Sequence, residues 1–139
     1  MKGFKFIKME ISSDGRIATI TLNRPEKKNA INLSMHREID SVLSHLSNEK
    51  NLGALIVTGT KDSFSAGADV RDVFIGSRAD PKRFHEINTI SYSWLQKLRN
   101  FPKPTVAAVN GYCIGGGISI LGACDLAVAS SKATLVYQK

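Results

Sequence analysis

One stretch of the sequence decides the fold: Thr105-Val-Ala-Ala-Val-Asn-Gly-Tyr-Cys-Ile-Gly-Gly-Gly-Ile-Ser-Ile-Leu-Gly-Ala-Cys-Asp125. Its apolar run, residues 106–109, predicts a buried strand that the following Asn-Gly pair ends. The residues from 117 onward predict a short buried helix, and three glycines at 115–117 precede it. A glycine backbone can approach a ligand closely, and the free N–H groups at a helix start suit a negatively charged oxygen. A plain tight turn explains the three glycines equally well.

Length and composition indicate one folded globular domain. The chain has 139 residues, of which 42% are hydrophobic. No apolar stretch reaches the roughly 18 residues of a membrane-spanning helix, and the start of the chain lacks the apolar region of a signal peptide. A cytoplasmic protein is therefore expected. Cys113 and Cys124 are expected to be buried thiols, and no set of residues has metal-ligand spacing.

The net charge of +7 favours an anionic partner. The basic residues are spread along the chain, with small clusters at Lys27-Lys28 and Lys82-Arg83. No dense basic run is present and aromatic residues do not alternate with basic ones, so nucleic-acid binding is not expected. A solvated basic surface is the simplest interpretation, and a phosphate-rich small ligand is the next.

The first half of the chain predicts an α/β layer. Residues 4–12 and 16–22 have strand patterns around a Ser-Asp-Gly turn and predict a hairpin. Residues 33–49 predict an amphipathic helix, and 54–59 a buried strand, so a crossover joins parallel strands. His36 and His45 lie off the apolar stripe of this helix and are expected to face solvent.

A second small-residue turn follows the strand at 54–59, at the edge where ligands bind in α/β sheets. Gly67 lies between Ala66 and Ala68, and Asp69 is placed to start a helix at 70–74. The backbone N–H of Ala68 is therefore expected to point into a pocket. A longer helix runs from Asp80-Pro81 to about residue 100, and a further strand covers 125–130. The inward side chains of this longer helix are expected to be Phe84, Ile87, Ile90, Trp94, Leu95 and Leu98.

Two strands are thus followed by the same local arrangement, a turn of small residues that leads into a helix. Two converging backbone N–H groups make an oxyanion hole, which stabilises the charge that builds on a reacting thioester carbonyl. The competing motifs fit less well. GxGxxG and Walker A are absent, and GxSxG is missing because Ser119 is followed by Ile120 and Leu121.

These residues closely resemble the crotonase, or enoyl-CoA hydratase/isomerase, superfamily. The order and spacing of five pieces match over essentially the whole chain. The pieces are Asn23-Arg24-Pro25 with Asn29-Ala30-Ile31-Asn32, Phe64-Ser-Ala-Gly-Ala-Asp-Val70, Lys103-Pro104-Thr105-Val-Ala-Ala-Val-Asn-Gly111, Ile114-Gly-Gly-Gly117 and Cys124-Asp125-Leu126.

The resemblance implies an α/β fold built as a spiral of β-β-α units, with residues 1–139 as the N-terminal portion of a single domain whose C-terminal portion is absent. It implies an acyl-CoA partner, no cofactor beyond the coenzyme A thioester substrate, and a trimer or hexamer in the full-length form. The oxyanion donors would be the N–H groups of Ala68 and Gly116. Coenzyme A would contact Lys28, Asn29, Ala30, Ala66, Gly67, Asp69, Val70 and Gly115.

Two departures from the family pattern bear on the chemistry. Hydratases of the family carry a glutamate two residues after the last glycine, where this chain has Ser119, and a serine hydroxyl is no general base at neutral pH. The second family glutamate falls close to Lys139, the last residue, and family domains are roughly twice as long.

The expected function is therefore acyl-CoA binding with stabilisation of a thioester enolate, without hydration by two glutamates. The full-length parent is expected to be an enzyme and this chain alone to be inactive. The alternative is a catalytically inactive fragment or a crotonase-like binding protein, with nucleic acid as its ligand. Uncovered apolar helix faces are expected around Trp94, Leu95 and Leu98, which would promote association.

Overall fold

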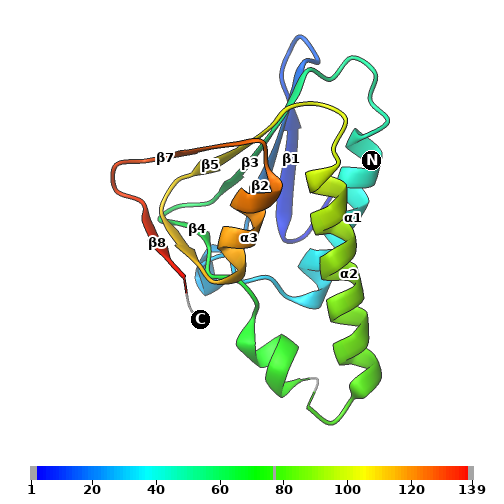
Figure 1. Cartoon of the computed structure of the whole chain (residues 1–139), viewed down its shortest axis with the longest axis vertical. Coiled ribbons are helices and arrows are strands. Elements are labelled where there is room, and N and C mark those ends of the chain that lie inside the picture. The colour runs from blue at the N-terminus through cyan, green and yellow to red at the C-terminus, as the bar shows by residue number, and fades with distance from the viewer. Residues whose placement is uncertain (1–2, 77, 138–139) are drawn as a thin grey trace.

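The computed structural model describes residues 3–76 and 78–137, which contain a five-stranded sheet (Figure 1). Its strands lie in the order β1-β2-β3-β5-β7. β1 runs antiparallel to β2, and the other neighbours are parallel, as the predicted crossover requires. The strands are β1 (Ile7–Ile11), β2 (Ile17–Leu22), β3 (Ala54–Gly59), β5 (Thr105–Val109) and β7 (Leu126–Ala129).

A second, smaller sheet contains β4 (Ser63–Ser65), β6 (Tyr112–Ile114) and β8 (Thr134–Val136), all parallel. Each of these strands directly follows a strand of the large sheet, so β3-β4, β5-β6 and β7-β8 repeat one arrangement. A helix follows β4 and another follows β6. This repetition is the expected spiral of β-β-α units, although none of the short strands was predicted.

Three main helices accompany the sheets: α1 (Leu33–Leu46), α2 (Pro81–Arg99) and α3 (Gly116–Ala123). The side chain of Asn32 accepts a hydrogen bond from the N–H of Met35 at 2.8 Å and caps α1, while Asp80 caps α2. Two short turns, η1 (Pro25–Lys27) and η2 (Arg71–Ile75), complete the helical elements. No helix in the described ranges is long and apolar enough to cross a membrane.

The core lies between the large sheet and the helices α1 and α2, which run side by side in Figure 1. Its fully buried side chains include Ile20, Leu22, Met35, Leu43, Leu55, Phe64, Leu98 and Ile120. Cys113 is also buried, as predicted, and Cys124 is half-buried. Burial raises the pKa of both thiols to about 11, so neither is ionised at neutral pH.

The prediction that His36 faces solvent is wrong. Helix α2 covers this flank of α1, and His36 is only 5% exposed. Its Nδ1 accepts a hydrogen bond from Nε1–H of Trp94 at 2.8 Å. Burial lowers the pKa of His36 to about 4, so the imidazole is neutral at physiological pH. His45 does face solvent, beside Glu49.

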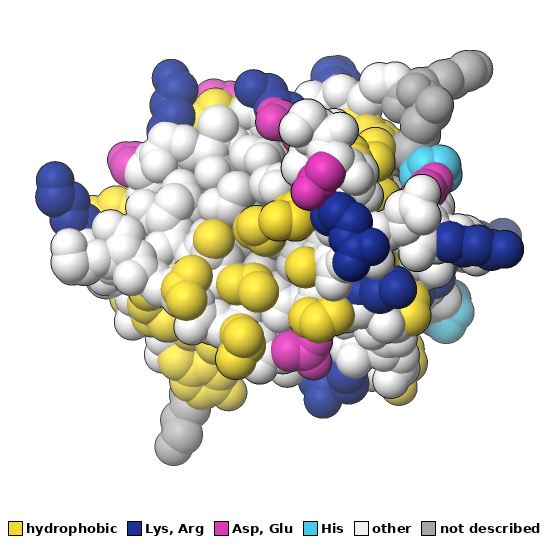
Figure 2. All heavy atoms as spheres, turned by 90° about the horizontal axis from the view of Figure 1, so that it is seen from above, with side chains coloured by type: hydrophobic (Ala, Val, Ile, Leu, Met, Phe, Trp, Pro, Cys, Tyr) yellow, Lys and Arg dark blue, Asp and Glu magenta, His cyan; other side chains and the backbone are white. Residues whose placement is uncertain are grey.

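The predicted site of exposed apolar surface is also wrong. Trp94 and Leu98 are 3% and 2% exposed because α1 and the large sheet cover them. Phe84, expected to face inward, is 41% exposed. The exposed apolar side chains instead include a group on β7, on β8 and just after it, namely Leu126, Val128, Leu135, Val136 and Tyr137. Figure 2 shows hydrophobic side chains gathered on one part of the surface.

Candidate active site

The loop after β4 presents one unused backbone donor. Ile31 pairs with this loop on one side: its N–H donates to the carbonyl of Gly67 at 2.8 Å, and its own carbonyl accepts from the N–H of Asp69 at 3.0 Å. Successive N–H groups of an extended segment point to opposite sides, so the N–H of Ala68 points away from Ile31. No acceptor among the described residues takes it.

The start of α3 presents a second unused donor. Gly115 has φ of +54°, and Gly116 is the first helical residue. The N–H groups of a first helical turn have no acceptor within the helix, and no described residue outside the helix accepts that of Gly116.

The glycines bring these two donors together. A Cβ added to Gly117 would lie 2.7 Å from the carbonyl oxygen of Ser65, so only glycine lets α3 begin directly against β4. A Cβ added to Gly67 would lie 2.8 Å from the backbone nitrogen of Gly116, and one added to Gly116 would lie 3.7 Å from that of Ala68. The segments around the two predicted oxyanion donors are thus in contact.

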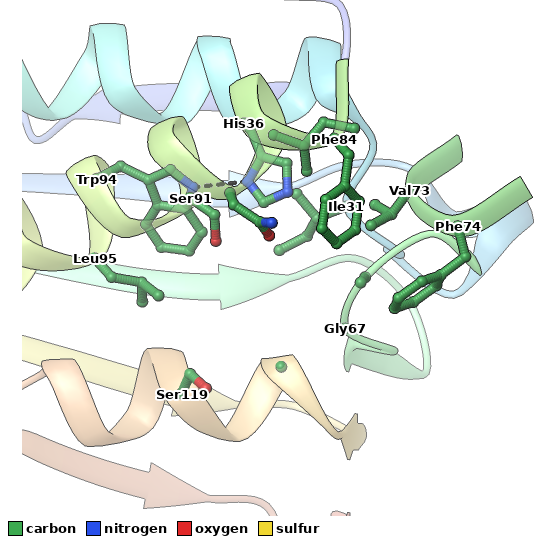
Figure 3. Close-up of a pocket in the computed structure, with 14 residues that line it drawn as sticks. Ile31, His36, Gly67, Val73, Phe74, Phe84, Ser91, Trp94, Leu95 and Ser119 are labelled. Carbon is green, nitrogen blue, oxygen red and sulfur yellow. Dashed lines mark hydrogen bonds between the residues drawn. The ribbon is translucent and has the colours of Figure 1, made fainter. Parts of the chain in front are cut away.

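Both donor residues line a cleft of about 200 Å³, here called the apolar cleft. Figure 3 shows Ser91, Trp94 and Leu95 of α2 across from Ser119 of α3. The wall is mostly apolar, with a few polar side chains among the hydrophobic ones. Its residues are Ile31, His36, Gly67, Ala68, Val73, Phe74, Phe84, Ile87, Asn88, Ser91, Trp94, Leu95, Gly116 and Ser119.

A second, more open cleft of about 680 Å³ also reaches Ala68 and is called the basic cleft. Three cationic side chains line it, those of Arg24, Lys27 and Arg71. The other lining residues are Ala30, Ala66, Ala68, Asp69, Val70, Asp72 and Gly76. Both carboxylates are engaged, Asp69 with Arg24 and Asp72 with Arg83. Ala68 therefore lies where the two clefts adjoin.

Arg24 joins the two loops that form the basic cleft. Its Nη1 donates to the carboxylate of Asp69 at 2.5 Å and to the carbonyl of Ala30 at 3.0 Å. Burial is the largest single influence on the pKa of Asp69 and raises it, but the hydrogen bonds from Arg24 and from backbone N–H groups, together with the charge of Arg24, outweigh burial, so the pKa lies below its usual value. The Asp69 carboxylate also accepts from the N–H of Asp72 at 3.1 Å and starts the turn η2, as predicted.

The structure separates the predicted coenzyme A residues into three groups. Ala30, Ala66, Asp69 and Val70 line the basic cleft, and Gly67 lines the apolar cleft.

Lys28, Asn29 and Gly115 line neither cleft. Lys28 pairs with Asp62 at 2.9 Å, and this hydrogen bond raises the pKa of Lys28. Asn29 is fully buried: its side chain accepts from the N–H of Arg24 and donates to the carbonyl of Ser63, each at 2.8 Å. The Asn29 side chain thus holds the loop together and has no exposed surface to offer a ligand.

The sequence reasoning missed several residues of the apolar cleft, chiefly His36, Asn88 and Ser91. A signal existed on α2, because Asn88 and Ser91 interrupt the inward apolar stripe between Ile87 and Trp94. His36 carried no such signal, since its burial depends on contact between two helices.

Comparisons with known proteins point to one family. The family model for enoyl-CoA hydratase/isomerase matches residues 12–139. A hydroxycinnamoyl-CoA hydratase-lyase from Pseudomonas fluorescens is 43% identical over 133 residues, covering 94% of this chain and 48% of the relative. A 4-chlorobenzoyl coenzyme A dehalogenase-2 from Arthrobacter sp is 35% identical over 125 residues, covering 89% and 45%.

Solved structures give the same assignment. The crystal structure of an enoyl-CoA hydratase/carnithine racemase from Magnetospirillum magneticum superposes with a TM-score of 0.88 at 28% identity, covering 97% of this chain and 50% of that one. The chain spans about half the length of these relatives and corresponds to their N-terminal half. On the family match and the crotonase-type fold together, the chain belongs to the enoyl-CoA hydratase/isomerase family.

Proposed function

We propose that the protein binds a coenzyme A thioester with its thioester group beside Ala68, where the two clefts adjoin, and stabilises negative charge on the thioester oxygen. One observation carries the proposal: two unused backbone donors, from Ala68 and Gly116, line one cleft, and Ala68 also lines a basic cleft beside it. Two N–H groups at one point suit a carbonyl oxygen that becomes an oxyanion, and their charge stabilisation needs no rearrangement during the reaction.

The two clefts fit the two ends of such a ligand. Coenzyme A carries phosphates, which suit the cationic lining of the basic cleft, where no described carboxylate forms an ion pair with Lys27 or Arg71. The acyl group would then enter the apolar cleft. The names of two relatives, the hydroxycinnamoyl-CoA hydratase-lyase and the 4-chlorobenzoyl coenzyme A dehalogenase-2, support a coenzyme A compound as the ligand, although their reactions differ.

The described residues of the apolar cleft offer oxyanion stabilisation without a carboxylate acid or base. Ser119 lies in the wall. We take it to replace the first glutamate of the family hydratases, and its neutral hydroxyl is a poor base. His36 is neutral and its Nδ1 is occupied by the Trp94 hydrogen bond, so its proton lies on Nε2. We therefore propose enolate-type chemistry on a thioester, with the acid or base supplied from outside this set and without hydration by two glutamates.

Two substitutions at one residue test the proposal. Gly116→Pro removes the N–H without removing any hydrogen bond between described residues, and proline is tolerated at the first position of a helix. Gly116→Ala is the matched control, since it keeps the N–H and its Cβ would meet the Gly67 backbone at an ordinary 3.6 Å.

The measurement is the infrared carbonyl stretch of acetyl-CoA carrying ¹³C at the thioester carbon, bound to the purified protein. A donated hydrogen bond lowers this frequency, so the wild type and Gly116→Ala should lower it and Gly116→Pro should lower it less. In a turnover assay, loss of one oxyanion donor typically costs about 100- to 1,000-fold. Equal frequencies in all three proteins, with acetyl-CoA bound, would refute the role of Gly116.

A further inference from the structure

One nitrogen of the His36 imidazole takes part in a hydrogen bond, and the other has no hydrogen-bond partner among the described residues. Nδ1 accepts a hydrogen bond from Nε1–H of Trp94 at 2.8 Å. The direction is certain because an indole N–H can donate a hydrogen bond but cannot accept one. The neutral ring therefore carries its single proton on Nε2. No described protein atom accepts that proton, although the residue is only 5% exposed.

The free Nε2–H opens onto the apolar cleft. Among the described residues, no fully buried side-chain nitrogen or oxygen lacks a partner. Nε2 must therefore retain some access, and the ring lines the apolar cleft. Figure 3 shows the ring between Trp94 on one side and Ile31 and Phe84 on the other, with its second nitrogen turned away from Trp94.

The surroundings of this donor define what it could bind. Ile31, Val73, Phe84 and Ile87 make the nearby wall apolar, so a ligand group here loses contact with water. The imidazole is neutral and offers no positive charge to pair with an anion, and an unpaired charge in such surroundings is costly. A neutral oxygen, such as a hydroxyl, phenol or ketone, meets both conditions.

We propose that His36 is a specificity-determining residue that donates a hydrogen bond from Nε2 to a neutral oxygen on the acyl group of the bound thioester. The inference rests on the proposed function and adds the class of acyl group, an oxygen-bearing chain or ring in place of a plain alkyl chain. Trp94 is a positioning residue here, because its hydrogen bond fixes the tautomer that makes Nε2 a donor. Asn88 and Ser91 lie in the same wall.

The energetic reason is the cost of an unmatched donor. An alkyl group in this cleft would cover Nε2–H without accepting its proton, and a buried unsatisfied donor costs about 1–3 kcal/mol. The matched oxygen-bearing ligand avoids that cost. A preference of roughly 5- to 150-fold over an alkyl analogue of equal size follows from the same figure.

The test is a matched series of saturated acyl-CoA ligands measured by calorimetry. Each ω-hydroxyacyl-CoA is compared with the alkyl acyl-CoA that has the same number of heavy atoms, over several chain lengths. The wild type should bind at least one hydroxylated member at least about fivefold more tightly than its alkyl partner. His36→Gln should reduce this preference, because the new amide lacks the ring geometry, and His36→Phe should abolish it. His45→Gln, at an exposed position of the same helix, should keep it.

A second measurement needs no substitution. The ¹⁵N resonance of His36 Nε2 in the wild type should shift when the preferred hydroxyacyl-CoA binds and stay nearly unchanged with the alkyl analogue. Equal affinities throughout the series, with free coenzyme A still bound, would overturn the role of His36 and leave the proposed function standing. Absence of binding by every thioester and by free coenzyme A would overturn both.

Discussion

The buried pair of His36 and Trp94 should make the stability of the protein depend on pH in a defined window. Burial lowers the pKa of His36 from 6.5 to about 4 in the folded state, and the opposing charge of Asp72 does not offset it. Between these two values the unfolded chain binds more protons than the folded one, so the free energy of unfolding falls as the pH falls. The full contribution is present above pH 6.5 and is lost progressively towards pH 4.

The size of the effect follows from the shift. Each pKa unit corresponds to about 1.4 kcal/mol, so the complete loss is about 3 kcal/mol, and a change from pH 8 to pH 5 removes about 2 kcal/mol. This is a large fraction of the stability of a small domain. The depressed pKa values of Asp14, Asp62 and Asp69 lie below 3.8, so these carboxylates titrate outside the window.

The assay is urea unfolding of the wild type, His36→Gln and His45→Gln at pH 8 and pH 5. The difference between the two pH values should be about 2 kcal/mol smaller in His36→Gln than in the wild type, and unchanged in His45→Gln. Identical pH dependence in all three proteins would refute the reasoning. So would an NMR titration in which the His36 imidazole protonates near 6.5 in the folded state.

Three further substitutions test the packing, the loop geometry and the exposed sheet face. Gly117→Ala, whose Cβ would lie 2.7 Å from the Ser65 carbonyl oxygen, should destabilise the protein by about 1–3 kcal/mol in urea unfolding, whereas Gly122→Ala, with open space at its Cβ, should not. Arg24→Met removes the ion pair and hydrogen bond between the two loops and should weaken coenzyme A binding in calorimetry; unchanged affinity would contradict its role. Leu126→Lys, at a position 65% exposed on β7, should lower the self-association that we expect in sedimentation, and a monomeric wild type would contradict this.

Local sequence signals predicted the long elements of the fold. The strand at 54–59 and the helices that begin after Asn32 and Asp80 combine apolar periodicity with a capping residue, and the structure has them with their ends shifted by at most a few residues. Strands of three residues cannot show a period, so β4, β6 and β8 were missed. Ser63–Ser65 in particular contains a single apolar side chain, yet all three residues are buried because β6 pairs with this strand and β3 and α3 pack against it.

The candidate site, like the fold, was predicted only where the signal lies within a short stretch of sequence. Glycine and alanine at 66–68 and 115–117 predicted two backbone donors, because small residues before a helix are a local signal. The contact between the two segments, the burial of His36 and the engagement of the Asn29 side chain all depend on packing between distant parts of the chain. Periodicity within one helix placed His36 outside the apolar stripe, and only the position of α2 shows that this flank is covered.

The bridge between Ile31 and the loop around Ala68 has a consequence for the order of folding. The paired donors depend on three segments, near residues 31, 68 and 116, which come from successive turns of the spiral. Bringing such distant segments together costs loop-closure entropy, so the donors reach their positions only after β3 and β5 have paired. The amide protons of Ile31 and Asp69, which hold the bridge, should gain protection from hydrogen exchange once the segments near residues 31 and 68 have met, and their protection marks the first of the two contacts that the site needs.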